Sequence, residues 1–327
     1  MNRLSTIAAE VPASFPVPPD ASQWAGPSRL RALREAGVTL FLFLCAAVTV
    51  LTTAGIIVVL GVESFRFFAK SGVGVFEFLF GTELNPEGNP PRYGILPLIW
   101  GTFVIAVGSS VIALPIGLLS AIYLSEYAPK RVRAVLKPAL ELLAGIPSIV
   151  YGYLALLLVT PLLQRLFSPL GISVEPFNVL SACIVVGVMI VPMVSSLSED
   201  VLSAVPRGLR EAGYGLGATK FEVSTRIVLP AGLSGVVASF ILAISRAIGE
   251  TMAVVLAAGT SRQFRFNPLT SMETMTAYIV AVTGGEASYG SPEYLSLFAV
   301  GMALFLITLA LNILSSLVLR RYREVYQ

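Results

Sequence analysis

Histidine is absent from this sequence of 327 residues, and cysteine occurs only twice. Without an imidazole, the chain has neither a histidine metal ligand nor a histidine acid–base catalyst. Cys45 and Cys183 both lie in apolar stretches, where a thiol behaves as a small hydrophobic side chain. We therefore expect both cysteines to pack in the protein rather than to bind a metal or form a disulfide.

Charged residues are also scarce. They make up 13% of the chain, against about a quarter in a typical soluble domain. The net charge of +3 is too small to indicate a nucleic-acid partner. Hydrophobic residues make up 55% and fall in long blocks, which predicts an integral membrane protein.

The motifs of several enzyme classes are missing from the sequence. There is no Gly-x-x-x-x-Gly-Lys-Ser/Thr phosphate loop, and the glycine-rich stretch 213–220 does not have that spacing. Neither a catalytic carboxylate pair, nor a nucleophile elbow, nor a metal-ligand cluster is present. We therefore do not expect the chain to hydrolyse ATP or to be an enzyme in its own right.

Six apolar runs can each supply the roughly 20 residues that a helix needs to cross a bilayer. A single run in lipid must satisfy its own backbone hydrogen bonds, so each is expected to be helical. The predicted fold class is an all-α integral membrane protein with six transmembrane helices. Two prolines in the second run, Pro97 and Pro115, predict a bent helix or two pieces. The runs are residues 37–61, 94–124, 142–163, 177–198, 227–259 and 294–319.

The ends and loops predict the domain organisation and the orientation. Residues 1–36, rich in Ala, Pro and Ser, are interpreted as a disordered cytoplasmic N-terminal tail, and residues 37–327 as a transmembrane domain. Fifteen Lys and Arg residues lie in the two ends and in loops 125–141 and 199–226, whereas the alternate loops hold six. The positive-inside rule therefore places both termini in the cytoplasm.

The segment before the fifth run, about residues 199–230, is unusually regular for a connector. Leu202, Val205 and Leu209 recur at helical spacing with charged residues between them. Glycines at positions 213, 215 and 217 then predict a turn between two short helices. The sequence itself also permits an amphipathic loop that lies on the membrane surface.

A spaced pattern in this segment resembles the coupling loop of ATP-binding-cassette (ABC) importer permeases. The family pattern is Glu-Ala-Ala, three residues, Gly, nine residues, Ile-x-Leu-Pro, and the spacing here is the same, with glycine in place of the second alanine. This resemblance implies a type I ABC importer permease fold, with the loop docked on a cytoplasmic ATPase. The matching residues are Glu211, Ala212, Gly213, Gly217, Ile227, Leu229 and Pro230.

Two charges, Arg246 and Glu250, lie deep inside the fifth run. Each costs about 2.5–3.5 kcal/mol at the centre of a bilayer. Because they are four residues apart, we expect them to share a helix face and to pair. The pair is either a structural ion pair or part of an anion site, for which the arginine fork matches phosphate oxygens.

Two segments, residues 245–251 and 145–152, resemble the phosphate importer permeases of the phosphate-specific transport system. The Gly-Glu-Thr-Met run at 249–252 and the long loop 62–93 are most like the C subunit (PstC) of that system. In the second segment Pro147 frees a carbonyl, and Ser148 and Tyr151 are candidates to line the substrate pathway. The alternative is that its glycines only allow close helix packing.

The resemblance implies import of inorganic phosphate by ATP-driven alternating access in a bacterial plasma (inner) membrane. It implies a second homologous permease subunit, two copies of an ATP-binding subunit that holds ATP and Mg, and an extracytoplasmic phosphate-binding protein. Membrane lipid is a further partner, and no cofactor, metal or nucleic acid is expected on this chain. Three alternatives remain: a permease for sulfate, molybdate or a phosphonate, an anion channel or carrier without an ATPase, and a membrane scaffold or sensor subunit.

Overall fold

The computed structural model describes residues 29–285 and 287–322, with side chains from 33 to 317 except 286. The chain divides into two parts, residues 1–58 and 59–327, which are treated separately. Most of the predicted tail, residues 1–28, lies outside the described residues. Helix α1 (Arg29–Ser71) begins before the expected start at residue 37, because residues 29–36 are mostly good helix formers that extend the apolar helix.

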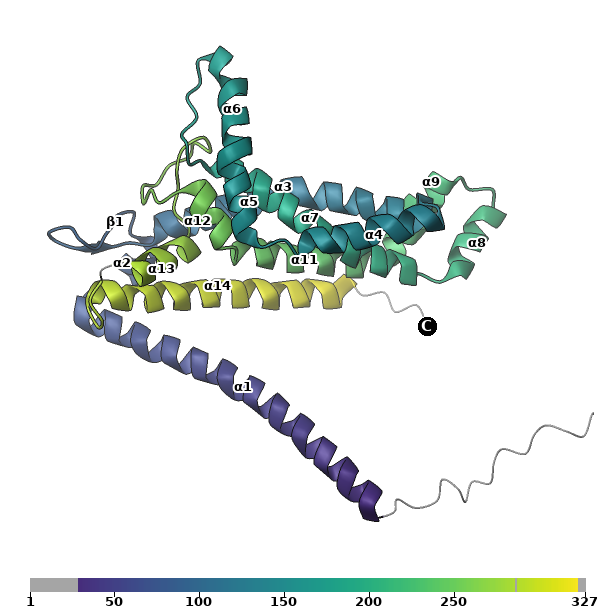
Figure 1. Ribbon diagram of the computed structural model, residues 1–327, viewed down its shortest axis with the longest axis horizontal. Coiled ribbons are helices and arrows are strands. Elements are labelled where there is room, and N and C mark those ends of the chain that lie inside the picture. The colour runs from purple at the N-terminus through teal and green to yellow at the C-terminus, as the bar shows by residue number, and fades with distance from the viewer. Residues whose placement is uncertain (1–28, 286, 323–327) are drawn as a thin grey trace, which may run out of the picture. The chain divides into compact units, whose positions relative to one another are not determined.

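The core of the second part consists of α3 (Leu96–Ile122), α7 (Val179–Ala204) and α11 (Leu233–Ile248), which pack side by side (Figure 1). A Cβ atom on Gly108 of α3 would lie 2.5 Å from Sγ of Cys183 on α7. Small residues let membrane helices approach this closely. Cys183 is buried in this contact, as expected, whereas Cys45 is exposed on α1, contrary to the expectation that both pack in the protein.

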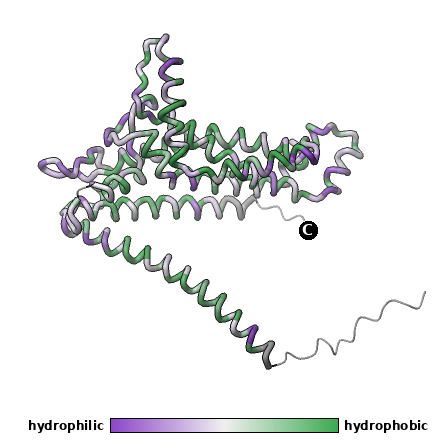
Figure 2. The backbone as a smooth tube through the Cα atoms, in the orientation of Figure 1, coloured by the Kyte–Doolittle hydropathy of each residue, from purple (hydrophilic) through white to green (hydrophobic). Residues whose placement is uncertain are grey.

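The apolar helices agree with the predicted six spans. Among the described residues, five helices are long and apolar enough to cross a membrane, and a sixth span results if residues 220–231 and 233–248, bent by 72°, are counted as one. Figure 2 shows hydrophobic residues along α3, α7 and α11, with hydrophilic residues gathered around α8 and α9. The second run is one helix, α3, rather than two pieces, followed by the π-helical turn η2 (Tyr123–Tyr127).

The third and fifth runs are helical, as predicted, but each contains a break. Proline and glycine break them, because proline lacks a backbone donor and glycine is a poor helix former. The third run begins in the end of α4 (Lys130–Ala144) and continues through α5 (Ser148–Leu154), η3 (Ala155–Val159) and the start of α6 (Thr160–Phe167). The short helix η4 (Ser168–Leu170) follows after the run. In the fifth run, α11 ends at Ile248 and α12 (Met252–Ala258) follows after a break.

One end of the second part, called here the hairpin end, holds a small antiparallel hairpin and a separate apolar cluster. Leu84 of β1 (Leu84–Asn85) is opposite Tyr93 of β2 (Arg92–Tyr93). The cluster packs the end of α1 against the neighbouring helices, with Phe67 and Tyr278 fully buried. These helices are α2 (Val75–Phe80), α13 (Met275–Gly284) and α14 (Pro292–Tyr322).

The opposite end of α3 and α7, called here the α8 end, carries the segment that matches the coupling-loop pattern (Figure 1). It consists of α8 (Arg207–Gly215), α9 (Lys220–Val223), the π-helical turn η5 (Ser224–Val228) and α10 (Leu229–Ala231).

Candidate functional site

The coupling-loop segment folds as two short helices with a glycine turn, as the sequence predicted. Gly217 has φ +83°, a left-handed conformation that glycine adopts without strain. Thr219 then caps α9: its hydroxyl accepts a hydrogen bond from the Glu222 backbone N–H, and the Glu222 carboxylate accepts one from the Thr219 backbone N–H at 2.9 Å. The turn therefore fixes the direction in which α9 leaves α8.

Gly213 is buried where α8 presses against the following turn. A Cβ atom at this position would lie 2.6 Å from Cδ1 of Ile227 and 3.0 Å from Cγ2 of Val223. The glycine that departs from the family pattern is thus a close-packing position that faces the protein's own interior. Glu211 and Ala212 are exposed on the other side of α8, which leaves them free to contact a partner.

The last two residues of the pattern connect the short helices α8 and α9 to the membrane helices. Leu229 is half-buried in the cluster that includes Leu202 and Val223, whereas Pro230 is exposed in α10. The residues of the pattern therefore divide into an inward-facing set, Gly213, Ile227 and Leu229, and an exposed set that includes Glu211, Ala212, Gly217 and Pro230.

An ion pair that the sequence did not reveal holds α8 against the rest of the protein. The Arg210 guanidinium donates to Oε1 of Glu126 in η2 at 2.9 Å. It also donates to the backbone carbonyls of Leu202, at 2.7 Å, and Val205, at 2.5 Å, at the end of α7. The last carbonyls of a helix lack intrahelical partners, so an arginine placed there satisfies them and complements the helix dipole.

A second group of charges, also not predicted, joins α4 to α7. Glu199 of α7 is fully buried, and its carboxylate accepts hydrogen bonds from Arg133, from Lys137 at 2.7 Å and from Ser203 at 2.7 Å. Hydrogen bonds to Asp200, and then to Glu199, raise the pKa of Lys137 above its ordinary value. A buried carboxylate needs such partners, because its desolvation is otherwise costly.

The break between α4 and α5 contains two of the predicted pathway residues. Pro147 has no backbone N–H to give to the Leu143 carbonyl, and the Tyr151 hydroxyl donates to that carbonyl at 3.0 Å. The Leu143 carbonyl also accepts from the Ile146 backbone N–H at 3.3 Å, so the carbonyl predicted to be free is satisfied within the protein. Ser148 is half-buried as the first residue of α5.

Close packing, the alternative reading of the same segment, also occurs. A Cβ atom on Gly152 would lie 2.9 Å from Cβ of Leu256 and 3.2 Å from Cα of Ala253. This contact brings α5 against α12, so the glycine places the α5 side chains beside the broken fifth span.

Arg246 and Glu250 do not form the predicted pair. Arg246 lies in the last turn of α11, which ends at Ile248, and Glu250 lies in the break before α12. Among the side chains described between residues 33 and 317, no ion pair joins the two. Instead, the Glu250 carboxylate accepts a hydrogen bond from the Ala253 backbone N–H at 3.3 Å. The pairing prediction is wrong because α11 ends at Ile248, so the helical i,i+4 spacing does not continue to Glu250.

The break nevertheless brings three of the predicted residues into one region. Arg246 is exposed in the last turn of α11, four residues before Glu250, and Tyr151 precedes Gly152, which packs on α12. Glu250 is half-buried at the start of α12, the helix that packs on α5. No hydrogen bond of the Arg246 guanidinium occurs within the described part of the chain. Its fork of donors is therefore available to an oxyanion.

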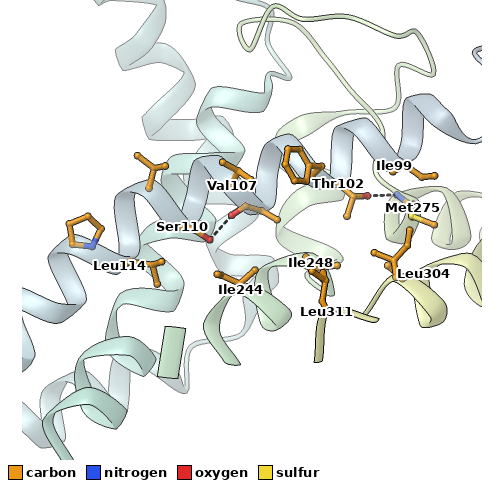
Figure 3. A pocket seen from close by; sticks show the side chains of 15 residues that line it. Ile99, Thr102, Val107, Ser110, Leu114, Ile244, Ile248, Met275, Leu304 and Leu311 are labelled. Atoms are coloured by element: carbon orange, nitrogen blue, oxygen red, sulfur yellow. Dashed lines mark hydrogen bonds between the residues drawn. The ribbon is translucent and has the colours of Figure 1, made fainter. Parts of the chain in front are cut away.

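An apolar groove of this part lies on another face of α11 (Figure 3). It has a volume of about 560 Å³ and is lined by α3, α11, α13 and α14, without any charged residue. Ile244 and Ile248 of α11 face it, and Arg246, two residues from each, therefore projects to the opposite side of the helix. The groove suits hydrocarbon and contains none of the predicted pathway residues.

The hairpin end holds a buried carboxylate that sequence reasoning also missed. Oε2 of Glu273 accepts a hydrogen bond from Nε of Arg262 at 2.9 Å, and the Arg262 guanidinium lies 5.3 Å from the centre of the Tyr278 ring. Oε1 of Glu273 is buried and has no hydrogen-bond partner among the described residues. Burial raises the pKa of this carboxyl group, although the Arg262 charge partly opposes the shift.

Glu273 is therefore expected to make the melting temperature of the purified transporter depend on pH. Between the ordinary pKa of 4.5 and the raised pKa, the Glu273 carboxyl group holds its proton in the folded protein but has lost it in the unfolded chain. The stabilising contribution is complete below that pH and decreases as the pH rises through the raised pKa. The difference in melting temperature between wild type and Glu273→Gln should therefore fall as the pH rises above about 4.5.

A matched control for this measurement is Glu222→Gln at the α8 end. The hydrogen bonds from Thr219 hold the pKa of Glu222 below its ordinary value, so its contribution has the opposite pH dependence. If the melting temperature of wild type minus that of Glu273→Gln stayed constant or increased as the pH rises, the raised pKa assigned to Glu273 would be contradicted.

The chain is similar to known transport proteins. Residues 113–324 match the family described as binding-protein-dependent transport system inner membrane component. The phosphate transport system permease protein PstC of Mesorhizobium japonicum is 33% identical over 315 residues, which cover 89% of this chain and 95% of that protein. PstC of Xylella fastidiosa strain 9a5c is 38% identical over 261 residues, covering 75% and 78%.

A solved structure shares the fold. A bacterial ABC transporter involved in the import of the acidic polysaccharide alginate has a TM-score of 0.61 at 15% identity, covering 91% of this chain and 100% of that chain. At this identity the likeness concerns the fold, and it agrees with the predicted type I ABC importer permease architecture. The chain belongs to the binding-protein-dependent transport system inner membrane components, a family of ABC importer permeases.

Proposed function

We propose that this chain is the membrane-spanning permease subunit of an ABC importer that moves inorganic phosphate into the cytoplasm by ATP-driven alternating access. The observation that carries the proposal is the Arg246 guanidinium, an exposed charge in a largely apolar span with no hydrogen-bond partner among the described residues. The relatives named as phosphate transport permeases support the choice of phosphate among oxyanions.

The proposed complex contains four kinds of subunit. An extracytoplasmic phosphate-binding protein delivers phosphate, and this chain encloses the pathway with a second, homologous permease. Two copies of an ATPase subunit bind ATP and Mg and hold the coupling loop at its exposed residues, Glu211 and Ala212. The excess of Lys and Arg at the α8 end and at the termini supports a cytoplasmic location for both.

Arg246 stabilises the anion during its passage. Phosphate carries a charge between about −1 and −2 near neutral pH. One guanidinium neutralises it only in part, so a second cation from the partner permease completes the site. Incomplete neutralisation also favours transport, because an anion that is held too tightly is released slowly.

Glu250 acts in selectivity. A carboxylate repels a fully charged anion, but it accepts a hydrogen bond from a protonated phosphate oxygen. Sulfate has no such proton at neutral pH and leaves the carboxylate unpaired beside a negative charge, which is costly. The carboxylate therefore distinguishes the two anions, as long as its second oxygen remains free while the first caps α12.

Glu250→Gln is expected to weaken the rejection of sulfate. The amide removes the repulsion and can donate a hydrogen bond, so discrimination should fall by about tenfold, from the loss of roughly 1.4 kcal/mol. The measurement is uptake of radiolabelled phosphate by proteoliposomes that contain the complete complex and its binding protein, with unlabelled sulfate, molybdate or a phosphonate as competitor.

Thr251→Ala is the matched control, since it changes a neighbouring side chain whose hydroxyl donates only to the Gly249 carbonyl. Unchanged discrimination in Glu250→Gln would exclude the selectivity role. Wild-type uptake that sulfate or a phosphonate inhibits more strongly than unlabelled phosphate would assign the permease to that other oxyanion instead.

A further inference from the structure

We propose that the charged groups at the α8 end form the mechanical linkage that transmits movement of the coupling helix α8 to the anion region around Arg246. This inference rests on the proposed function and adds the contacts through which movement of α8 reaches the anion region, with the residues that form them. None of these residues touches the substrate, and each acts through the helix that it holds.

The first connection ties α8 to two membrane helices at once. Arg210 of α8 binds Glu126 at the end of α3 and the carbonyls of Leu202 and Val205 at the end of α7. The Arg210 and Glu126 side chains are only 16% and 5% exposed, so water competes little for this ion pair. Displacement of α8 by a bound ATPase would therefore move the ends of α3 and α7 with it.

The second connection ties α7 to α4. Glu199 lies one helical turn before Ser203, close to the carbonyls that Arg210 binds, and its buried carboxylate holds both Arg133 and Lys137 of α4. Lys137 also donates to the neighbouring Asp200. Two cations on successive turns of α4 fix both the position and the rotation of that helix against α7.

The third connection ends beside the anion region. At the other end of α4, the Leu143 carbonyl accepts the hydrogen bond from Tyr151 of α5. The next residue, Gly152, packs against Ala253 of α12, whose backbone N–H donates to Glu250. These contacts thus form a continuous series from α8 through α7 and α4 to α5 and α12. The direct covalent route from α9 to α11 instead passes through the π-helical turn η5 and a bend of 72°.

The test is the ratio of phosphate transported to ATP hydrolysed, measured in proteoliposomes that hold the complete complex and its binding protein. Glu126→Gln keeps the side-chain shape and removes the charge that holds Arg210. We expect ATP hydrolysis and subunit composition to be retained while the ratio falls about 5- to 150-fold, the usual range for coupling between sites. Glu126→Asp, which keeps the charge, should recover most of it.

Ser203→Ala provides a second, milder variant, because it removes one hydroxyl from the Glu199 cluster and leaves both ion pairs in place. It should lower the ratio several-fold, and its effect combined with Glu126→Gln should be less than multiplicative if both act in one linkage. Arg226→Gln is the matched control: it removes an exposed pair with Glu222 at 3.9 Å, outside the series, and should leave the ratio unchanged.

An unchanged ratio in Ser203→Ala and in an assembled Glu126→Gln complex would overturn the proposal. The proposal would also be overturned if the ratio of phosphate transported to ATP hydrolysed fell only because the complex had lost its ATPase subunits. The Arg210–Glu126 pair would then have a purely structural role. If the wild-type complex transports another oxyanion, the proposed substrate is wrong, and the same ratio measured with that anion still tests the linkage.

Discussion

Arg246→Gln is expected to lower phosphate uptake by about tenfold or more, while the ATPase subunits still co-purify with the membrane complex. The substitution removes a charged donor from the anion region, and hydrogen bonds to charged groups contribute about 1.5–3 kcal/mol each. Arg246 has no hydrogen-bond partner within the described residues, and α11 packs in the core through other residues, such as Ala243 and Ala247. The fold should therefore be retained. The measurement is radiolabelled phosphate uptake in cells, with a blot that confirms equal membrane expression.

Two variants sharpen this experiment. Arg246→Lys keeps the charge but loses the planar fork, and we expect an intermediate loss of uptake. Arg165→Gln is the matched control, since it removes an exposed arginine from α6 and causes the same change in net charge. Normal uptake in Arg246→Gln would make Arg246 a structural residue and leave the substrate assignment as an unproven anion.

Gly213→Leu is expected to abolish uptake for a different reason, because it disrupts the packing of α8 in the coupling-loop segment. A leucine side chain has no space at this position, because even a Cβ atom would lie 2.6 Å from Ile227 and 3.0 Å from Val223. Overpacking costs typically 1–3 kcal/mol, which is sufficient to separate α8 from η5. The ATPase subunits should then fail to co-purify, a result that distinguishes this variant from Arg246→Gln.

A smaller side chain at Gly213, and a leucine elsewhere on α8, test whether the lack of space at Gly213 is the cause. Gly213→Ala should be tolerated, since the nearest atom is Cδ1 at the end of the flexible Ile227 side chain, which can turn away from the added Cβ atom. Gly208→Leu is the matched control on the same helix, because nothing lies within 4 Å of its Cβ position. Normal ATPase binding in Gly213→Leu would show that the close contact between α8 and η5 is not required for coupling.

Several features followed from consecutive residues alone, because they depend on length and local spacing. The six apolar runs required membrane helices, since only a helix satisfies its own backbone within a single run in lipid. The glycines after Ala212 marked the turn between α8 and α9, and Pro147 marked a break that frees a carbonyl. Each of these properties belongs to a few neighbouring residues and does not depend on which helices pack together.

Only the tertiary structure decided which charges meet. The periodicity of the fifth run paired Arg246 with Glu250, but the helix ends between them and Glu250 caps the next helix instead. Arg210 and Glu126 are 84 positions apart, and Arg133 and Glu199 are 66 apart. No local pattern connects such residues, because a buried ion pair depends on the packing of separate helices and on the exclusion of water around both charges.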